Sequence, residues 1–368
     1  MKTKFAVAVV ALALTLPVQG QEESSVSLGL QVYALYQHAD SSLEGRDSDA
    51  FGNINRFFGD WTVFADDTSN LGRIEWRVES RSNIGNYQAP GSLGSATGIA
   101  ALAPGFGYSE NFEPDIAILN WTQVFANGRA RYSVGRLAFD LYFDDFPFLT
   151  YTRGFMNRSF IINPTMPTAG SGALGGVVEG FVSDHIWLGT QIFDANAASG
   201  EFDWDTVEED EWLKAVEIGY APSIAERHNN RIQFTYWQKD ERTLAGASKG
   251  SGWAVSAIHE LGEKYLPFVR FGHSDGGGSV AAESAFSAGV EIKQRFDHVW
   301  TVGAGWAKPS RKTFGRGLNN ETVLETSYRF QLSKSFSITP DVQVVFNPAN
   351  SPDHSSVWVF GLRALLSM

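Results

Sequence analysis

The sequence predicts an all-β protein, a transmembrane antiparallel β-barrel of about 16 strands with long external loops. Three observations lead to this prediction. Apolar and polar residues alternate with a period of two in many segments, each segment has about the ten residues that a tilted strand needs to cross a bilayer, and no good helical stripe lies between them. The composition, with 43% hydrophobic and 19% charged residues, is that of a folded chain and excludes disorder.

The N-terminus predicts a secretory signal peptide. Lys2 and Lys4 precede an apolar run from Phe5 to Leu16, and the residues up to Gly20 fit a cleavage site. The run is too short to span the hydrocarbon core as a membrane anchor. We therefore expect residues 1–20 to be removed and residues 21–368 to form one barrel domain. Because the chain has no Cys, its stability must be non-covalent.

The alternation is clearest over residues 73–81. Ile74, Trp76 and Val78 point one way, and Arg73, Glu75, Arg77, Glu79 and Arg81 point the other. The same period recurs at residues 26–36, 186–192, 253–257, 286–292, 300–306, 322–330, 338–346 and 358–366. Many of these segments end in Trp, Tyr or Phe, which is typical of the aromatic girdles of a membrane barrel and favours it over a soluble sandwich.

The expected barrel has a water-filled lumen, because about 16 strands enclose more space than side chains can fill. Residues 223–230 and 333–335 have the length of short turns. Residues 82–113, 138–175 and 194–211 form long connections rich in Gly, Ser, Pro or acidic residues. Long connections of such barrels lie outside or fold into the pore.

Several short motifs follow one another in the C-terminal part. They are an acidic strand from Glu325, a Pro-Asp-x-Gln strand at 340–343, Asn-Pro at 347–348 and Gly-Leu-Arg at 361–363. Internal pieces at 134–140 and 155–164 complete the set. Together these motifs resemble the OprB-like carbohydrate-selective porins, most strongly over 131–167 and 321–368. The resemblance implies a sixteen-stranded outer-membrane barrel that lets sugars diffuse through an arginine-lined constriction.

The charged side of residues 73–81 is the first candidate for the pore wall. An Arg side chain offers five fixed donors to sugar hydroxyls or carboxylates, and a neighbouring Glu supplies acceptors while it reduces the net charge. A mixed wall of this kind favours neutral, hydroxyl-rich solutes. The alternative is a wet lumen face on which the charges only pair with one another. The full set of predicted pore-lining residues is Arg73, Glu75, Arg77, Glu79, Arg81, Arg131, Arg136, Asp140, Glu325 and Arg329.

The long segment after residue 137 carries aromatic side chains among acidic ones. They are Phe139, Tyr142, Phe143, Phe146, Phe148 and Tyr151, interleaved with Asp140, Asp144 and Asp145. Such rings could face the apolar side of a sugar, or they could anchor a loop folded inside the barrel. Both interpretations remain open from the sequence.

The expected partners are small sugars as permeating solutes, together with outer-membrane lipid and lipopolysaccharide. A net charge of −12 argues against nucleic acid. The seven His residues have no spacing suited to zinc, so we predict no metal and no cofactor. The acidic run 194–211 is typical of a solvated loop, and the alternative is that it binds divalent cations or contacts lipopolysaccharide. Large porins are often trimers, and a homotrimer is therefore a further expectation.

The sequence also allows functions other than sugar diffusion. A general or organic-acid porin is the first alternative, and a barrel enzyme or scaffold is the second. Residues 272–276 match a nucleophile elbow around Ser274, and residues 170–175 match a dinucleotide fingerprint, but no helix is expected after either one. We therefore predict that the protein is not an enzyme.

Overall fold

A computed structural model of the chain describes residues 25–66, 69–105, 111–142, 144–148, 150, 152–168, 172–199, 204–351 and 353–368. The expected signal peptide, residues 1–20, lies outside these residues. Sixteen strands are present: β1 (Ser25–Ala39), β2 (Asp49–Ala65), β3 (Leu71–Asn83), β4 (Phe112–Phe125), β5 (Ala130–Leu137), β6 (Ala173–Phe181), β7 (Ile186–Asp194), β8 (Trp212–Tyr220), β9 (Arg231–Lys239), β10 (Gly250–Ile258), β11 (Tyr265–Ser274), β12 (Ala282–Lys293), β13 (Val299–Pro309), β14 (Glu321–Gln331), β15 (Phe336–Phe346) and β16 (Ser356–Ser367).

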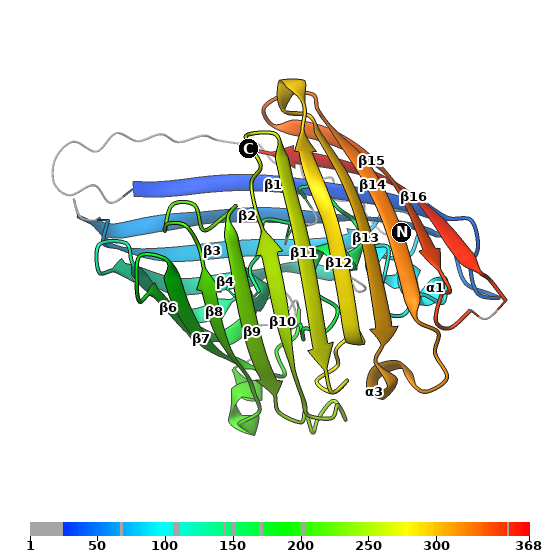
Figure 1. Cartoon of the computed structure of the whole chain (residues 1–368), viewed down its shortest axis with the longest axis horizontal. Coiled ribbons are helices and arrows are strands. Elements are labelled where there is room, and N and C mark those ends of the chain that lie inside the picture. Colours follow the sequence, from blue (N-terminus) through cyan, green and yellow to red (C-terminus); the bar gives the residue numbers. More distant parts are fainter. Residues whose placement is uncertain are drawn as a thin grey trace, which may run out of the picture.

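The strands form one closed antiparallel barrel (Figure 1). Each strand pairs with its neighbours in sequence, and β1 closes the barrel by pairing with β16 from Gln31 to Ala39. Short helical pieces lie in the connections: η1 (Pro90–Ser92), α1 (Leu93–Ala96), η2 (Phe139–Leu141), α2 (Arg158–Ile161), η3 (Asp205–Glu209), η4 (Arg295–Asp297) and α3 (Arg311–Phe314). In the part of the chain that is described, no helix has the length and apolar character to cross a membrane.

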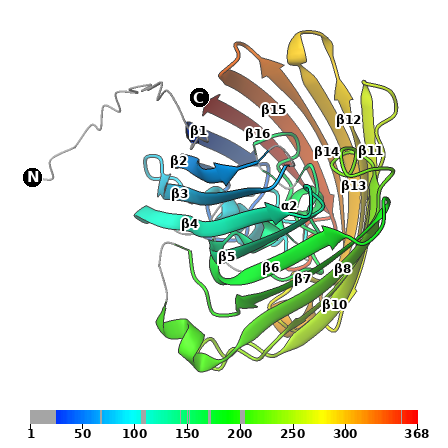
Figure 2. The ribbon, with the colours of Figure 1, turned by 90° about the vertical axis from the view of Figure 1, so that its left-hand side faces the viewer.

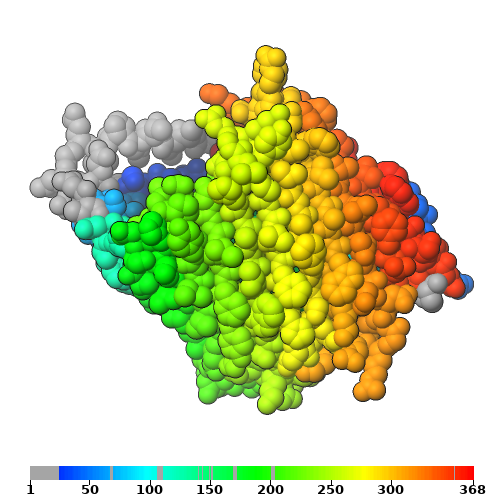
Figure 3. Space-filling model, in the orientation of Figure 1, coloured from blue at the N-terminus to red at the C-terminus, as the bar shows by residue number. Residues whose placement is uncertain are grey.

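The period-two alternation separates the two faces of the barrel wall. Ala215 on β8 pairs with Trp237 on β9 and both are buried, whereas their neighbours Val216 and Tyr236 form an exposed pair. The exposed side chains of β9–β14 give the outer wall its continuous surface in Figure 3. Outward-facing aromatic residues gather near both ends of the strands: Tyr220, Tyr265, Trp300 and Phe330 at one end, and Tyr236, Trp253, Trp306 and Trp358 at the other. The predicted fold class is confirmed.

Long and short connections lie at opposite ends of the barrel. Because successive strands run in opposite directions, the connections after odd-numbered strands share one end and those after even-numbered strands share the other. The three longest connections, 84–111, 138–172 and 195–211, follow β3, β5 and β7 and therefore lie at the same end. Connections at the other end include the brief turns 126–129, 182–185 and 332–335.

Candidate functional site

Two of the long connections fold into the barrel, and their apolar side chains form much of its buried interior (Figure 2). We call the described parts of residues 84–111 the first lumen segment and those of residues 138–172 the second lumen segment. The buried apolar residues of the two segments are Ala89, Leu93, Ala96, Ile99, Ala101, Leu102, Ala138, Phe139, Phe146, Phe148, Phe155, Met156, Phe160, Ile161, Ile162 and Met166. The two lumen segments therefore occupy part of the barrel interior, which is narrower than the surrounding strands alone would make it.

An aromatic cluster fixes the second lumen segment to the wall. Phe268 on β11 lies at its centre, with ring centroids 5.3 Å from Phe146, 5.2 Å from Phe148, 5.6 Å from Phe155 and 6.3 Å from Phe160. All five rings are buried, and their tilted and edge-on arrangements are those that aromatic pairs prefer. The rings Phe139, Phe146 and Phe148 thus anchor the segment, whereas Phe143 and Tyr151 lie outside the described residues.

The wall accommodates the second lumen segment by having glycine on its inner face. A Cβ atom on Gly303 of β13 would lie 2.8 Å from the ring of Phe160 and 2.9 Å from that of Phe155. A Cβ atom on Gly272 of β11 would lie 2.0 Å from the Thr165 hydroxyl and 2.8 Å from the Asn163 side chain. Small inner residues at these positions let the segment lie directly against the strands.

The sequence motifs at 155–158, 325 and 340–343 meet in space. Both oxygens of the Glu325 carboxylate accept backbone N–H groups, from Met156 at 2.5 Å and from Asn157 at 3.0 Å. The Asn157 side chain in turn donates to the Gln343 side chain at 3.0 Å. These buried hydrogen bonds hold the middle of the second lumen segment on β14 and β15, so the motifs have a clear structural role.

Arginines of the wall also hold this segment. Arg363 on β16 donates to the Gly154 carbonyl at 3.1 Å, and Arg329 on β14 donates to the Arg153 carbonyl at 3.4 Å. Arg153 of the segment makes a bidentate pair with Glu291 on β12, at 2.9 and 2.8 Å. A bidentate charged pair fixes orientation as well as distance.

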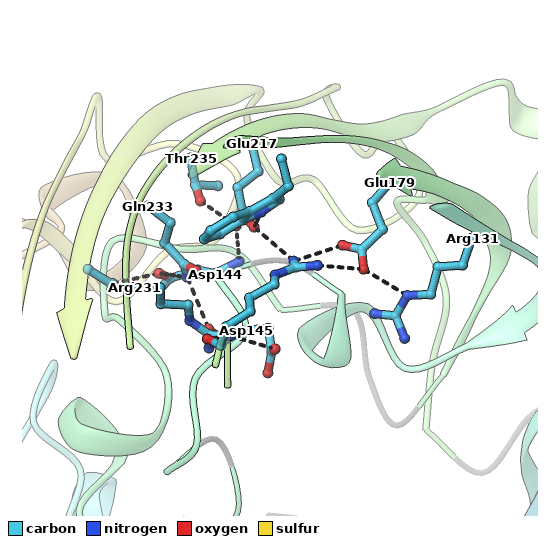
Figure 4. Close-up of polar contacts among 11 residues, drawn as sticks. Arg131, Asp144, Asp145, Glu179, Glu217, Arg231, Gln233 and Thr235 are labelled. Atoms are coloured by element: carbon cyan, nitrogen blue, oxygen red, sulfur yellow. Dashed lines mark hydrogen bonds and ion pairs between the residues drawn. The ribbon is translucent and has the colours of Figure 1, made fainter. Parts of the chain in front are cut away.

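A third attachment lies over β8–β11, where Figure 4 shows Asp144 and Asp145 beside Arg231 and below Glu217. The Asp144 carboxylate pairs with the buried Arg270 of β11, and its backbone N–H donates to Glu217 at 3.0 Å. Asp145 pairs with Arg231 at 3.3 Å. The second lumen segment is therefore fastened along the wall from β8 to β16.

One buried carboxylate holds the first lumen segment. Glu321 on β14 accepts the backbone N–H groups of Ala100 at 2.7 Å, Ala101 at 2.8 Å and Leu102 at 3.0 Å, and that of Ala349 at 2.9 Å. Four amide donors compensate the charge of this carboxylate. Both lumen segments are thus attached to the same strand.

The wall across the lumen carries the charged residues of β3, which we call the ladder: Arg73, Glu75, Arg77, Glu79 and Arg81. β3 and β11 lie half a circumference apart, and Figure 1 shows β1–β4 behind the strands of the other wall. Glu79 of the ladder accepts from Arg56 of β2 and from Arg81, both at 2.6 Å, and Arg77 lies 3.6 Å away. Three guanidinium groups therefore surround one buried carboxylate on the inner face.

The ladder continues onto β5 and β6. Arg131 donates to Glu179 at 2.7 Å, and the two lie side by side in Figure 4. Arg227, from the connection between β8 and β9, makes a bidentate pair with the same carboxylate at 3.0 Å and stacks 4.4 Å above the Trp187 ring. Burial disfavours the Arg227 charge, but the Glu179 carboxylate outweighs it and holds the pKa of Arg227 above its ordinary value.

Comparison with known proteins agrees with this architecture. The model of the carbohydrate-selective porin, OprB family, matches residues 262–368, the part that supplies β11–β16 and their anchoring residues. The resemblance to the OprB family is confirmed. The chain has the fold of an OprB-like porin, since it aligns with the high-pH structure of Pseudomonas putida OprB at a TM-score of 0.72, with 12% identity over 93% of this chain and 94% of that one.

Other porins share the fold and part of the sequence. Porin AaxA of Chlamydia abortus is 22% identical over 323 residues, which are 83% of this chain and 68% of that porin. Porin AaxA of Chlamydia felis is 22% identical over 319 residues, 83% of this chain and 69% of that porin. A triple mutant of the Rhodopseudomonas blastica porin aligns with a TM-score of 0.54 and 11% identity, covering 94% of this chain and all of that one. The chain therefore shares the porin fold with these structures.

Most of the predicted pore-lining residues face the interior of this OprB-like barrel. Arg73, Glu75, Arg77, Glu79, Arg81 and Arg131 lie on the inner face, where Arg73 and Glu75 pair at 2.5 Å. Arg136 is fully buried and donates to the Ala198 carbonyl at 3.1 Å. Glu325 and Arg329 also point inward, but they hold the second lumen segment. The side chain of Asp140 lies outside the described residues.

Sequence reasoning missed two inward-facing residues that matter in the OprB-like barrel, Arg227 and Glu321. Arg227 lies in a connection that was expected to be an ordinary turn, so nothing in its surroundings indicated an inward side chain. Glu321 was missed because its partners are distant in sequence. Arg153 was noted on the long segment, but its pairing with Glu291 could not be predicted. The only local signal was the polar face of the 321–331 strand, which places Glu321 on the same side as Glu325.

The two enzyme-like motifs have structural explanations. Ser274 ends β11, and its hydroxyl donates to the Ala282 carbonyl at 2.8 Å in a hairpin connection. Of the stretch 170–175, residues 170 and 171 lie outside the described part, and from Ala173 the chain is strand β6 rather than a helix. Among the residues described, no group of three or more His, Asp or Glu side chains is arranged to hold a metal ion.

Proposed function

We propose that this protein lets small carbohydrates diffuse passively across the bacterial outer membrane, through a constriction between the β3 ladder and the second lumen segment. The observation that carries the proposal is that a row of guanidinium groups on β2, β3 and β5 faces the barrel interior, across from a segment fastened to the other wall. Donors in fixed positions suit the oxygens of sugars. Weak contacts at such a constriction bias passage without slowing exit.

The proposal includes the route and surroundings of the protein. Residues 1–20 direct export and are removed, and residues 21–368 form the barrel in the outer membrane, with lipid on its apolar face. Lipopolysaccharide would contact the end that carries the long connections. Assembly as a homotrimer is part of this proposal, and its support is the porin fold alone.

Liposome swelling tests the sugar proposal. Purified protein is reconstituted, and the entry of glucose, a disaccharide and an amino acid of similar size is compared. Arg73→Ala and Arg77→Ala are measured beside Arg311→Ala, a control at the outer end of β13. The proposal is supported if the two ladder changes reduce glucose entry and the control change does not.

Other outcomes would contradict it. Entry that follows solute size alone, unchanged in the ladder variants, indicates a general porin. No swelling with any solute indicates a barrel enzyme or scaffold, and an activity lost on Ser274→Ala would then identify the enzyme.

A further inference from the structure

The ion pairs of the lumen are layered, with carboxylates toward the strands and guanidinium groups toward the lumen. The Glu79 side chain has no exposed surface, whereas those of Arg56, Arg77 and Arg81 are 14%, 16% and 10% exposed. A solute that reaches this part of the wall therefore meets arginine and not the glutamate behind it.

The same layering recurs at two other places. At β5 and β6, Glu179 is 6% exposed while Arg131 is 33% exposed. On the second lumen segment, Arg153 is 26% exposed and its partner Glu291 on β12 is 2% exposed. The arrangement is thus found on both sides of the lumen.

One pair on the second lumen segment is inverted. Asp145 is 31% exposed and its partner Arg231 is 2% exposed. Glu75 and Arg73 of the ladder are exposed to similar extents, 24% and 34%. Among these ion pairs the exposed carboxylates are Glu75 and Asp145, whereas exposed guanidinium groups extend over β2, β3, β5 and the second lumen segment. Asp60 of β2 and Asp115 of β4 are further half-buried carboxylates on the inner face of this wall.

A guanidinium group has donors only, and its planar fork matches a carboxylate in a bidentate pair. A neutral sugar hydroxyl can accept one hydrogen bond from it, but must find an acceptor elsewhere for its own hydrogen. Glu79, Glu179 and Glu291, the carboxylates paired with these arginines, are held behind them. A solute that carries a carboxylate therefore matches this surface better than a neutral sugar of the same size.

From this layering we infer that the preferred solutes are acidic sugars, hexoses that carry a carboxylate group, over neutral hexoses. The inference rests on the proposed function, since it assigns a substrate class to the same constriction. Recognition is local, through the exposed faces of Arg73, Arg77 and Arg131, and does not depend on the net charge of −12 of the whole chain.

The test is electrical and uses the purified protein in a planar bilayer. The reversal potential in a gradient of potassium glucuronate gives the permeability of glucuronate relative to potassium. A gradient of a potassium salt with a larger, hydroxyl-free carboxylate serves as a size reference, and glucose entry is followed by liposome swelling. The variants are Arg73→Gln, Arg131→Gln and the external control Arg311→Gln.

Glucuronate should be more permeant than its size predicts and should block chloride current at lower concentration than glucose does. Each ladder variant should lower the relative permeability of glucuronate about threefold, because one partly exposed charge makes a modest contribution. The control should leave the permeability unchanged.

Two failures are distinguishable. In the first, glucose entry depends on the ladder but glucuronate is no more permeant than its size predicts. This result would overturn the acidic-sugar inference and leave the proposed sugar diffusion standing. Absence of any ladder-dependent sugar entry would overturn the proposed function itself.

Discussion

The carboxylate of Glu325 accepts the backbone N–H of Asn157 at 3.0 Å, which joins strand β14 to the segment that crosses the lumen. The other carboxylate oxygen is occupied by Met156. In Glu325→Gln one oxygen becomes an NH₂ group that faces a backbone donor, so the attachment should weaken by about 1–3 kcal/mol. We expect larger and noisier single-channel conductance. Leu324→Val is the control, because this side chain lies on the outer face of the same strand. Equal conductance in the two variants would contradict the attachment.

The phenylalanine cluster gives a second way to release the same segment. Phe268→Ala removes the ring that four others contact, and replacing a buried Phe by Ala costs about 3–5 kcal/mol. The segment should become accessible to added protease while the barrel still resists heat in detergent. Phe271→Ala on the same strand faces outward and should leave the proteolysis pattern as it is in the unchanged protein. Loss of the whole barrel in Phe268→Ala would show that the ring supports the wall and not the segment.

Gly303 allows the segment to approach the wall closely. Gly303→Val introduces a Cβ atom that would lie under 3 Å from two aromatic rings, so the segment should shift toward the ladder. Conductance should fall, the opposite direction to Phe268→Ala. Ala304→Val, at the next position and facing outward, should leave conductance unaffected. A rise in conductance would mean that the segment is expelled and not displaced.

Glu260 should make the short-turn end sensitive to acid. Its carboxylate is 2.8 Å from the Lys293 ammonium and accepts from Asn229 at 2.9 Å, and these contacts hold the pKa of Glu260 below its ordinary value. The stabilisation is present above the unfolded pKa of about 4.3 and is lost as the pH falls through the lower folded pKa. For a partly exposed pair it is about 0.2–1 kcal/mol.

Thermal unfolding in detergent measures this contribution. Glu260→Gln should lower the Tm slightly at pH 7 and have no effect once the pH is below the folded pKa. Glu263→Gln, in the same turn, is the control. A Tm difference between Glu260→Gln and the unchanged protein that persists under strongly acidic conditions would contradict this origin.

The fold could be predicted because a barrel wall repeats its information locally. The alternation over residues 73–81 alone determines which side of β3 faces inward, and each further strand adds an independent example. The position of Glu325 on the polar face of its strand was predicted for the same reason. Which segment covers Glu325 could not be predicted, because its contacts with Met156 and Asn157 join residues that are 169 and 168 positions apart in the sequence.

The aromatic residues after position 137 illustrate the same limit. From composition alone, these rings could either bind a sugar or anchor a loop. Phe146 and Phe148 anchor the loop, because they pack against Phe268, which lies more than a hundred residues further along the chain. Arg227 was missed because a connecting turn has no periodicity that would assign its side chains to a face.

The attachment of both lumen segments to β14 determines when the constriction can form. The two segments belong to the first half of this sequence, whereas Glu321 and Glu325 are synthesised well after them, and the contacts of Glu321 span up to 221 positions. An assembly intermediate that lacks the final strands has nothing on which either segment can dock. The two lumen segments should therefore dock last, after the sheet has closed on itself through β1 and β16, and a chain stalled before that step would keep an unobstructed barrel interior.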